Sequence, residues 1–143
     1  MKYKVLDRED YAKELDFRFY IDKCEDASGN IIYCLVACSK NGKHKRVLAE
    51  NYHFITFTQM NKAIKDFLMN EIEIKITNKL LNLKLHIRYG FAKYSDYFQI
   101  IDYQGNNSYF AHLGDFEGNY DLLTESIINY LEDLALNERL NTK

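Results

Sequence analysis

The sequence predicts an α+β fold: a two-layer sandwich in which an antiparallel sheet carries helices on one face. Two observations predict this class. Short segments with apolar residues at alternate positions, separated by turns that contain Gly and Asn, indicate antiparallel strands. Longer segments with apolar residues at helical spacing indicate amphipathic helices. The expected order is α-βββ-α-(β)βββ-α in one domain of residues 1–143.

Three segments are predicted to be helical. The acidic run DRED predicts a short first helix of about 8–15, because carboxylates are favourable at a helix N-terminus. Thr56 and Gln59 have the spacing of a capping box and begin an amphipathic helix of about 57–70. The last helix is expected over about 121–137. Its buried face should consist of Leu123, Ile127, Leu131 and Leu134.

The predicted strands follow one another through short turns. Asn-Gly at 41–42 is typical of a type I′ hairpin turn, and Gly-Asn-Asn at 105–107 marks another turn. The run 71–82 fits a strand, a linker or a continued helix, with strand or linker favoured. Strand 31–38 is apolar on both faces and should be central in the sheet. The expected strands cover about 17–21, 31–38, 44–49, 83–89, 96–103 and 108–113.

The element order contains an internal pseudo-repeat. Strand-strand-strand-helix occurs over about 16–70 and again over about 83–137, without sequence identity between the halves. The resulting order resembles the two-layer fold of type III secretion chaperones, small proteins that bind secreted effectors. The resemblance implies effector binding as an alternative function.

The composition is that of a soluble, cytoplasmic protein. No apolar run approaches the ~20 residues of a membrane span, and the N-terminus lacks the features of a signal peptide. Cys24, Cys34 and Cys38 should be reduced and half-buried, although the sequence does not exclude a disulfide between Cys24 and Cys34. The absence of proline and the excess of lysine over arginine are typical of an AT-rich genome, such as that of a low-GC bacterium or its phage.

Charge is distributed unevenly along the chain. Residues 1–93 carry a net charge of +5, whereas 94–138 contain nine acidic residues and no Lys or Arg. The positive charge is densest at a predicted hairpin tip, where Lys43, Lys45 and Arg46 are the candidate contacts for nucleic acid. A nucleic-acid footprint of ~6–10 phosphate contacts needs more basic surface than this. Nucleic acid is therefore not the expected partner.

The acidic half is also rich in aromatic residues. Tyrosine offers a large, stiff and amphipathic contact, and an acidic surface attracts a basic partner. About half of these aromatic side chains must point into the core of alternating strands, so a purely structural role is the competing interpretation. The residues expected to contact a basic protein partner are Asp96, Tyr97, Asp102, Tyr103, Tyr109, Asp115, Glu117 and Asp121.

No sequence motif for catalysis, a cofactor or a metal is present. A calcium loop beginning at Asp115 would need Gly and Glu where Tyr120 and Ser126 stand, and a helix N-cap at Asn119 or Asp121 explains the same residues. The four histidines lack H-x-H or HExxH spacing. We therefore expect no cofactor, no metal site and no catalytic residue.

The expected function is binding rather than catalysis. The acidic, tyrosine-rich half and the lack of catalytic motifs favour an inhibitor: an immunity protein against a toxin, or a phage antagonist of a host defence nuclease. A secretion-type chaperone is one alternative. A small hydrolase-like enzyme, with a site assembled from residues distant in sequence, is another. A homodimer also stays open.

Overall fold

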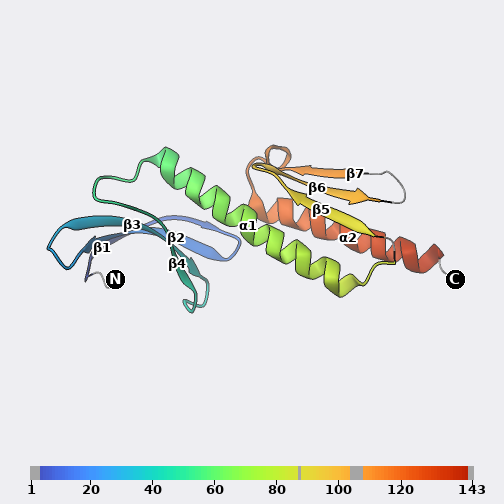
Figure 1. The fold of residues 1–143 in the computed structure, drawn as a ribbon, viewed down its shortest axis with the longest axis horizontal. Coiled ribbons are helices and arrows are strands. Elements are labelled where there is room, and N and C mark those ends of the chain that lie inside the picture. Colours follow the sequence, from blue (N-terminus) through green and yellow to red (C-terminus); the bar gives the residue numbers. More distant parts are fainter. Residues whose placement is uncertain (1–3, 87, 104–107, 142–143) are drawn as a thin grey trace. The chain divides into compact units, whose positions relative to one another are not determined.

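The computed structural model describes residues 4–86, 88–103 and 108–141 (Figure 1). These residues form an α+β protein with two antiparallel sheets, of four and three strands, and two long helices. The chain divides into two compact units, Met1–Leu68 (unit 1) and Met69–Lys143 (unit 2). The elements in chain order are β1 (Lys4–Glu14), β2 (Phe17–Glu25), β3 (Ile31–Ser39), β4 (Lys45–Asn51), α1 (Phe57–Leu83), β5 (Tyr89–Lys93), β6 (Tyr97–Asp102), β7 (Ser108–His112), the 3-10 helix η1 (Leu113–Phe116) and α2 (Tyr120–Asn141).

The prediction of a single sheet is wrong, because β1–β4 and β5–β7 form separate sheets. In each sheet every strand pairs with its neighbour in sequence. The segment between β4 and β5 forms α1, which begins in unit 1 and ends in unit 2. A helix satisfies its backbone hydrogen bonds internally, so this segment cannot extend a sheet. The predicted order of three strands and a helix does occur twice, as β2–β4 with α1 and as β5–β7 with α2.

The predicted first helix over 8–15 is wrong, because these residues belong mainly to β1. β1 pairs with β2 in an antiparallel hairpin that brings Glu14 opposite Phe17. Leu15 and Asp16 between them have φ angles of 50° and 63°, the positive values that a type I′ turn requires at both central positions. The acidic residues that suggested a helix start therefore lie on an outer strand of the sheet.

Two further turns connect the strands of unit 1. In the first, the Asp26 carboxylate accepts hydrogen bonds from the backbone N–H groups of Ser28 and Asn30, both at 2.9 Å. The bond from Asn30 is the largest cause that lowers the pKa of Asp26. In the second, Gly42 alone has a positive φ, of 74°, and Asn41 does not. The predicted type I′ turn at 41–42 is therefore wrong, although the hairpin and its return strand β4 are confirmed.

The first part of α1 covers one face of the unit 1 sheet. Its predicted capping box is confirmed, since Thr56 N–H donates to Gln59 Oε1 (2.9 Å) and Gln59 N–H to Thr56 Oγ1 (3.2 Å). Phe67 of α1 lies against Phe17 and Phe19 of β2 in edge-to-face contacts, with ring centroids 4.9 and 5.9 Å apart. These contacts bury the face of the sheet to which Phe19, fully buried, belongs.

The opposite face of the unit 1 sheet contains the three cysteines. Cys24, Cys34 and Cys38 are free thiols, buried together with Tyr20 and Val36. Burial raises the pKa of Cys34 to about 12, with a further contribution from Cys24 beside it. All three thiols are free in this structure, and they are more deeply buried than expected. β3, which carries two of them, is the central strand that its sequence predicted.

The run 71–82 is helical and continues α1 to Leu83, so the preference for a strand or linker is wrong. Ile72 and Ile76 are fully buried, whereas Ile74 between them is 47% exposed. The alternating isoleucines therefore belong to a helix, in which residues four apart, such as Ile72 and Ile76, share a face and residues two apart do not.

Unit 2 contains a three-stranded sheet in the order β5-β6-β7. The predicted strands over 96–103 and 108–113 are confirmed as β6 and β7. The strand predicted over 83–89 begins only at Tyr89, because Leu83 is still helical. Residue 87, and the turn predicted at 105–107, lie outside the described residues.

α2 and the second part of α1 form the helical layer of unit 2 (Figure 1). Asn119 caps α2, since its Oδ1 accepts the backbone N–H of Leu122 (3.0 Å). Lys79 of α1 and Glu132 of α2 form an ion pair at 2.9 Å. Of the predicted buried face of α2, the first three residues are fully buried, and Ala135 takes the place of Leu134, which is half-buried. Within the described residues neither helix has an apolar stretch long enough to cross a membrane.

Candidate functional site

The sheet of unit 2 has two different faces. On the inner face, Phe98 and Ile100 of β6 are buried in the core with the helices. Side chains at neighbouring positions point to the opposite, outer face, because successive residues of a strand alternate. Tyr97 on β6 and its β7 partner His112 are therefore on the outer face, and His112 is exposed. An exposed sheet face with aromatic side chains is the first candidate for a binding surface.

Four aromatic side chains gather at one end of this outer face, and we call them the aromatic row. Tyr97 lies at its centre, stacked on Tyr94 with ring centroids 4.3 Å apart and an angle of 9° between the planes. On its other side Tyr97 stacks on His112, at 4.7 Å and 28°. Phe110 lies 6.2 Å from Tyr97 and is 49% exposed. Mutual stacking fixes these rings while one side of the row stays in solvent.

Three exposed carboxylates lie in the turns at the same end of the sheet, and we call them the acidic rim: Asp96, Asp115 and Glu117. Asp96 precedes Tyr97, and its backbone C=O accepts the N–H of Leu113 (2.8 Å), which begins η1. This bond holds the loop of Asp96 against the turn that contains the other two acids. All three are exposed. The backbone therefore brings the two turns that carry the acidic rim to the same end of the sheet as the aromatic row.

Two of the predicted partner-binding residues are on the inner face instead. Tyr109 stacks on Tyr130 of α2, with centroids 4.2 Å apart and an angle of 10°, and its hydroxyl is hydrogen bonded to Ser126 Oγ. Asp102 lies near Tyr89 and Tyr130, whose pKa values are raised first by burial and then by this carboxylate. These residues stabilise the packing of unit 2 and do not belong to the exposed surface.

The remaining predicted residues are exposed but separate from the aromatic row. Tyr103 lies at the other end of β6, where its ring covers Gly90 of β5 so closely that a Cβ on Gly90 would collide with it. The guanidinium of Arg88 is 5.7 Å from the centre of the same ring. Asp121 is in the first turn of α2. Of the eight predicted residues, Asp96, Tyr97, Asp115 and Glu117 thus lie at the same end of the sheet.

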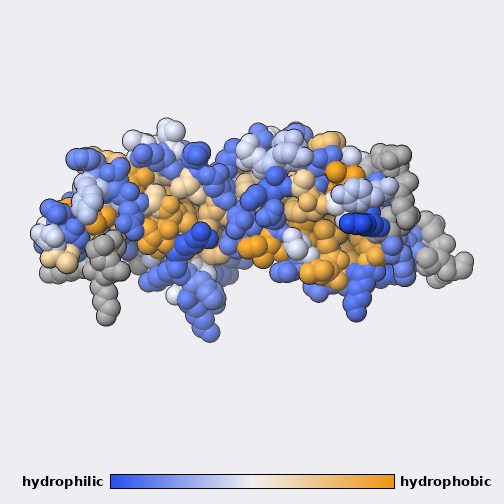
Figure 2. All heavy atoms as spheres, viewed as in Figure 1, coloured by the Kyte–Doolittle hydropathy of each residue, from blue (hydrophilic) through white to orange (hydrophobic). Residues whose placement is uncertain are grey.

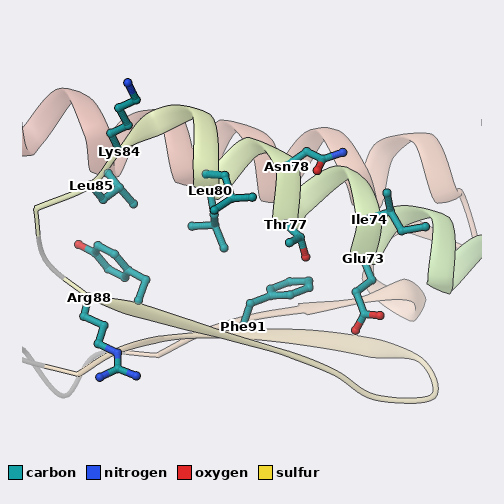
Figure 3. A pocket seen from close by; sticks show the side chains of 11 residues that line it. Glu73, Ile74, Thr77, Asn78, Leu80, Lys84, Leu85, Arg88 and Phe91 are labelled. Carbon is teal, nitrogen blue, oxygen red and sulfur yellow. The ribbon is translucent and has the colours of Figure 1, made fainter.

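The sequence did not predict a groove between the second part of α1 and β5. It has a volume of about 700 Å³ (Figure 3). Figure 3 shows Thr77 and Leu80 of α1 facing Phe91 of β5 across it. Ile74 and Leu81, which also line it, are 47% and 70% exposed. Hydrophobic residues gather on the surface over this part of α1 and β5 (Figure 2). The sequence signal for this groove was the presence of two exposed apolar residues, Ile74 and Leu81, on one helix. That signal could be recognised only if 71–82 had been assigned as helical.

Unit 1 offers two weaker candidates. Lys43, Lys45 and Arg46 are exposed at the hairpin between β3 and β4, as predicted for a solvated tip. A cavity of about 470 Å³ lies between the sheet and the start of α1, next to the ring pair of Tyr33 and Phe54. The cavity is lined by both an acidic and a basic side chain, Asp10 and Lys23, so it lacks the single sign of charge that the surface of unit 2 has.

Among the described residues, no three His, Cys, Asp or Glu side chains come together in a way that would hold a metal ion. No protein-family model, no curated protein and no solved structure matches the chain. The chemistry of the surfaces is therefore the basis for a functional proposal.

Proposed function

We propose that the protein is a non-catalytic inhibitor that binds a basic protein partner through the aromatic row and acidic rim of unit 2. The observation that carries this proposal is the position of Tyr97, which is stacked between Tyr94 and His112 at the end of the sheet where the turns with three exposed carboxylates lie. The combination provides an apolar centre and a charged border, which is the usual anatomy of a protein interface.

The stacking of the aromatic row lowers the cost of binding. An exposed side chain that is mobile must be ordered when a partner binds, at about 0.5–1.5 kcal/mol for each residue. Tyr97 already has a neighbouring ring on each side in the free protein. Its contact area is therefore available without much further ordering, as in interfaces built on rigid aromatic anchors.

The acidic rim supplies attraction and selectivity. Among the described residues, none of its three carboxylates forms an ion pair, and no Lys or Arg occurs from 94 to 138. Their field is therefore not cancelled by neighbours and accelerates encounter with a positively charged surface. A nuclease presents such a surface to nucleic acid, and an acidic protein that occupies it blocks the substrate. Inhibition of a toxin or defence nuclease is the function that this chemistry supports best.

The proposal is tested by affinity capture from a lysate of the native host, followed by kinetics with the captured protein. We expect a basic protein, retained at low salt and released at high salt, because attraction between exposed charges is screened beyond about 8–10 Å. The double reversal of Asp115→Lys and Glu117→Lys should slow association at least tenfold. Tyr97→Ala should speed dissociation, whereas Tyr97→Phe, which keeps the ring, should not.

The matched control is the double reversal of Lys43→Glu and Lys45→Glu in the hairpin of unit 1. It changes charge by the same amount with the opposite sign and should leave binding equal or stronger. The proposal fails if the lysine reversals abolish binding while the acidic reversals have no effect. The partner would then be an acidic protein or a nucleic acid that uses unit 1.

A further inference from the structure

We infer that the open edge of β7 is a dimerisation site, at which a second copy of the chain adds its own β7 as an antiparallel strand. This pairing joins the unit 2 sheets of the two copies into one continuous sheet. The inference does not rest on the proposed function, because it concerns the edge of the sheet and is tested without the basic partner.

The backbone of β7 provides the first argument. Leu113 N–H donates to Asp96 C=O (2.8 Å), and this pair continues the register of β6 and β7. Hydrogen-bonded positions alternate along an antiparallel pair, so every second residue before Leu113, beginning with Ala111, also directs its backbone groups toward β6. The residues that direct these groups away from β6 are therefore Ser108, Phe110 and His112. No described strand pairs with this edge, and in Figure 1 no helix or strand of unit 2 lies beyond it on the side away from β6.

The other three edge strands carry features that hinder pairing with another chain, such as charges, bulges or Gly. β1 contains the charged run DRED, and its register with β2 shifts at two places. β4 begins with Lys45 and Arg46 and has a register shift of its own. β5 contains Gly90 and ends at Lys93. β7 reads SYFAH, without Lys, Arg, Asp, Glu, Gly or Pro, and pairs with β6 without a shift.

The sequence of β7 is self-complementary, and this selects a second copy as the occupant. An antiparallel pair centred on Phe110 uses the whole strand and places Ser108 of each copy opposite His112 of the other. These positions all direct their backbone groups to the edge, so they form hydrogen-bonded pairs. Phe110, which is 49% exposed, meets the same ring of the other copy, and aromatic cross-strand pairs stabilise a sheet. On the inner side, the large Tyr109 of each copy lies opposite the small Ala111 of the other.

The charges of unit 2 allow two copies to pair at this edge. The acidic rim lies beyond the His112 end of β7, so antiparallel pairing puts the two rims at opposite ends of the joined strands. At ~3.3 Å per residue the strand separates them by roughly 15 Å, more than the ~8–10 Å over which exposed charges interact. β7 itself has no carboxylate that would select a basic strand in place of its own copy.

The test is sedimentation velocity of the full chain at about 5–500 μM, because a short edge buries less than a standard interface and should associate weakly. We expect the dimer fraction to rise with concentration. Hydrogen exchange followed by NMR locates the contact. At high concentration the amides of Ser108, Phe110 and His112 should exchange more slowly, whereas those of β5 should not change.

Charge substitutions test the edge and its register. Phe110→Lys opposes like charges at the centre of the pair and should weaken dimerisation at least tenfold. Its matched control, Tyr94→Lys, adds the same charge to the aromatic row away from the edge and should have little effect. Ser108→Glu with His112→Lys opposes unlike charges and should preserve or strengthen the dimer. Ser108→Lys with His112→Lys opposes like charges and should weaken it at least tenfold.

The inference is overturned if the chain stays monomeric at the highest concentration. It is also overturned if the two double variants dimerise equally, because the pairing would then not be centred on Phe110. Slower exchange of the β7 amides only after addition of the basic partner would assign this edge to that partner instead.

Discussion

Unit 1 and unit 2 share the order of three antiparallel strands and a helix, yet they differ in the second face of the sheet, the one opposite the helices. In unit 1, β3 is buried on both faces, with Leu35 and Cys34 both at most 2% exposed. In unit 2, β6 buries Phe98 and Ile100 on the inner face and presents Tyr97 on the outer face. The charges differ as well: unit 1 carries two more basic than acidic residues, and unit 2 four more acidic than basic.

The difference shows that strand order alone does not decide whether the second face of a sheet is buried or exposed. The second face of unit 1 consists mainly of cysteine, valine and isoleucine, which burial stabilises, although it also includes the buried Tyr20. Tyrosine and histidine on the outer face of unit 2 have polar groups that favour contact with water. The same arrangement of elements therefore gives one sheet that is buried on both faces and one sheet with an exposed face.

The largest predicted effect concerns the separate cores. Phe19→Ala in unit 1 should lower the free energy of unfolding by about 3–5 kcal/mol, and Ile127→Ala in unit 2 by about 2–5 kcal/mol, because both side chains are fully buried. Native-state hydrogen exchange should show which amides lose protection. We expect those of β2 and β3 in the first variant and those of β6 and α2 in the second.

One outcome of these exchange measurements would contradict the prediction. If each substitution speeds exchange equally in both sheets, the two units unfold together and their cores are not independent. Val47→Ala, at a position that is 46% exposed, serves as a control and should leave exchange in the core almost unchanged.

A smaller effect is expected at alkaline pH, where the buried thiols distinguish unit 1. The unfolded chain releases the Cys34 proton near pH 9, whereas the folded protein keeps it until about pH 12. The neutral thiol therefore contributes stability that is complete below pH 9 and is lost as the pH rises toward 12. The loss is about 1.4 kcal/mol per pH unit over this range. Urea unfolding of the reduced protein at pH 8, 9 and 10, followed by circular dichroism, measures it.

The Cys34→Ala variant separates this effect from general alkaline destabilisation. It should be less stable at pH 8, because it leaves a small cavity, but its stability should decline less steeply between pH 9 and 10. Equal slopes in the two proteins would show that Cys34 does not keep its proton in the folded state.

The smallest effects are predicted for the caps of the two helices. Thr56→Ala removes one hydrogen bond of the capping box of α1, and Asn119→Ala removes the cap of α2. Each substitution should lower the free energy of unfolding by about 1 kcal/mol. Thr58→Ala, on an exposed position inside the first turn of α1, should change stability by only a few tenths. Thermal unfolding measures all three. A cap variant as stable as Thr58→Ala would show that water replaces that cap without cost.

Much of the fold was predictable wherever a local signal was strong. The capping box at Thr56, and the N-cap that was expected at Asn119 or Asp121 and is formed by Asn119, depend on interactions between residues close in sequence. The central strand over 31–38 was recognised by its own continuous apolar run. β1 was missed because its turn uses Leu15 and Asp16 at positive φ, a conformation usually adopted by Gly or Asn. Burial of Leu15, which is 3% exposed, offsets this local preference and has no sequence signature of its own.

The candidate site was predictable only in part. β6 and β7 were predicted in the correct place. Because side chains alternate along a strand, this already puts Tyr97 and His112 on one face of the sheet and Phe98 and Tyr109 on the other. It does not show which of the two faces the helices cover. That depends on α1, whose second part was expected to be a strand or linker. The groove was not predicted for the same reason, since the second part of α1 forms one of its walls.

The strand orders β1-β2-β3-β4 and β5-β6-β7 have a consequence for how the protein reaches its fold. Each strand pairs with the one that precedes it, so no pairing has to wait for a distant segment. Short loops are cheap to close, and folds dominated by contacts near in sequence fold quickly. The hairpins can therefore form one after another while the chain is still being synthesised, beginning with β1 and β2. The first part of α1, which completes the first unit, also precedes all strands of the second unit in the chain.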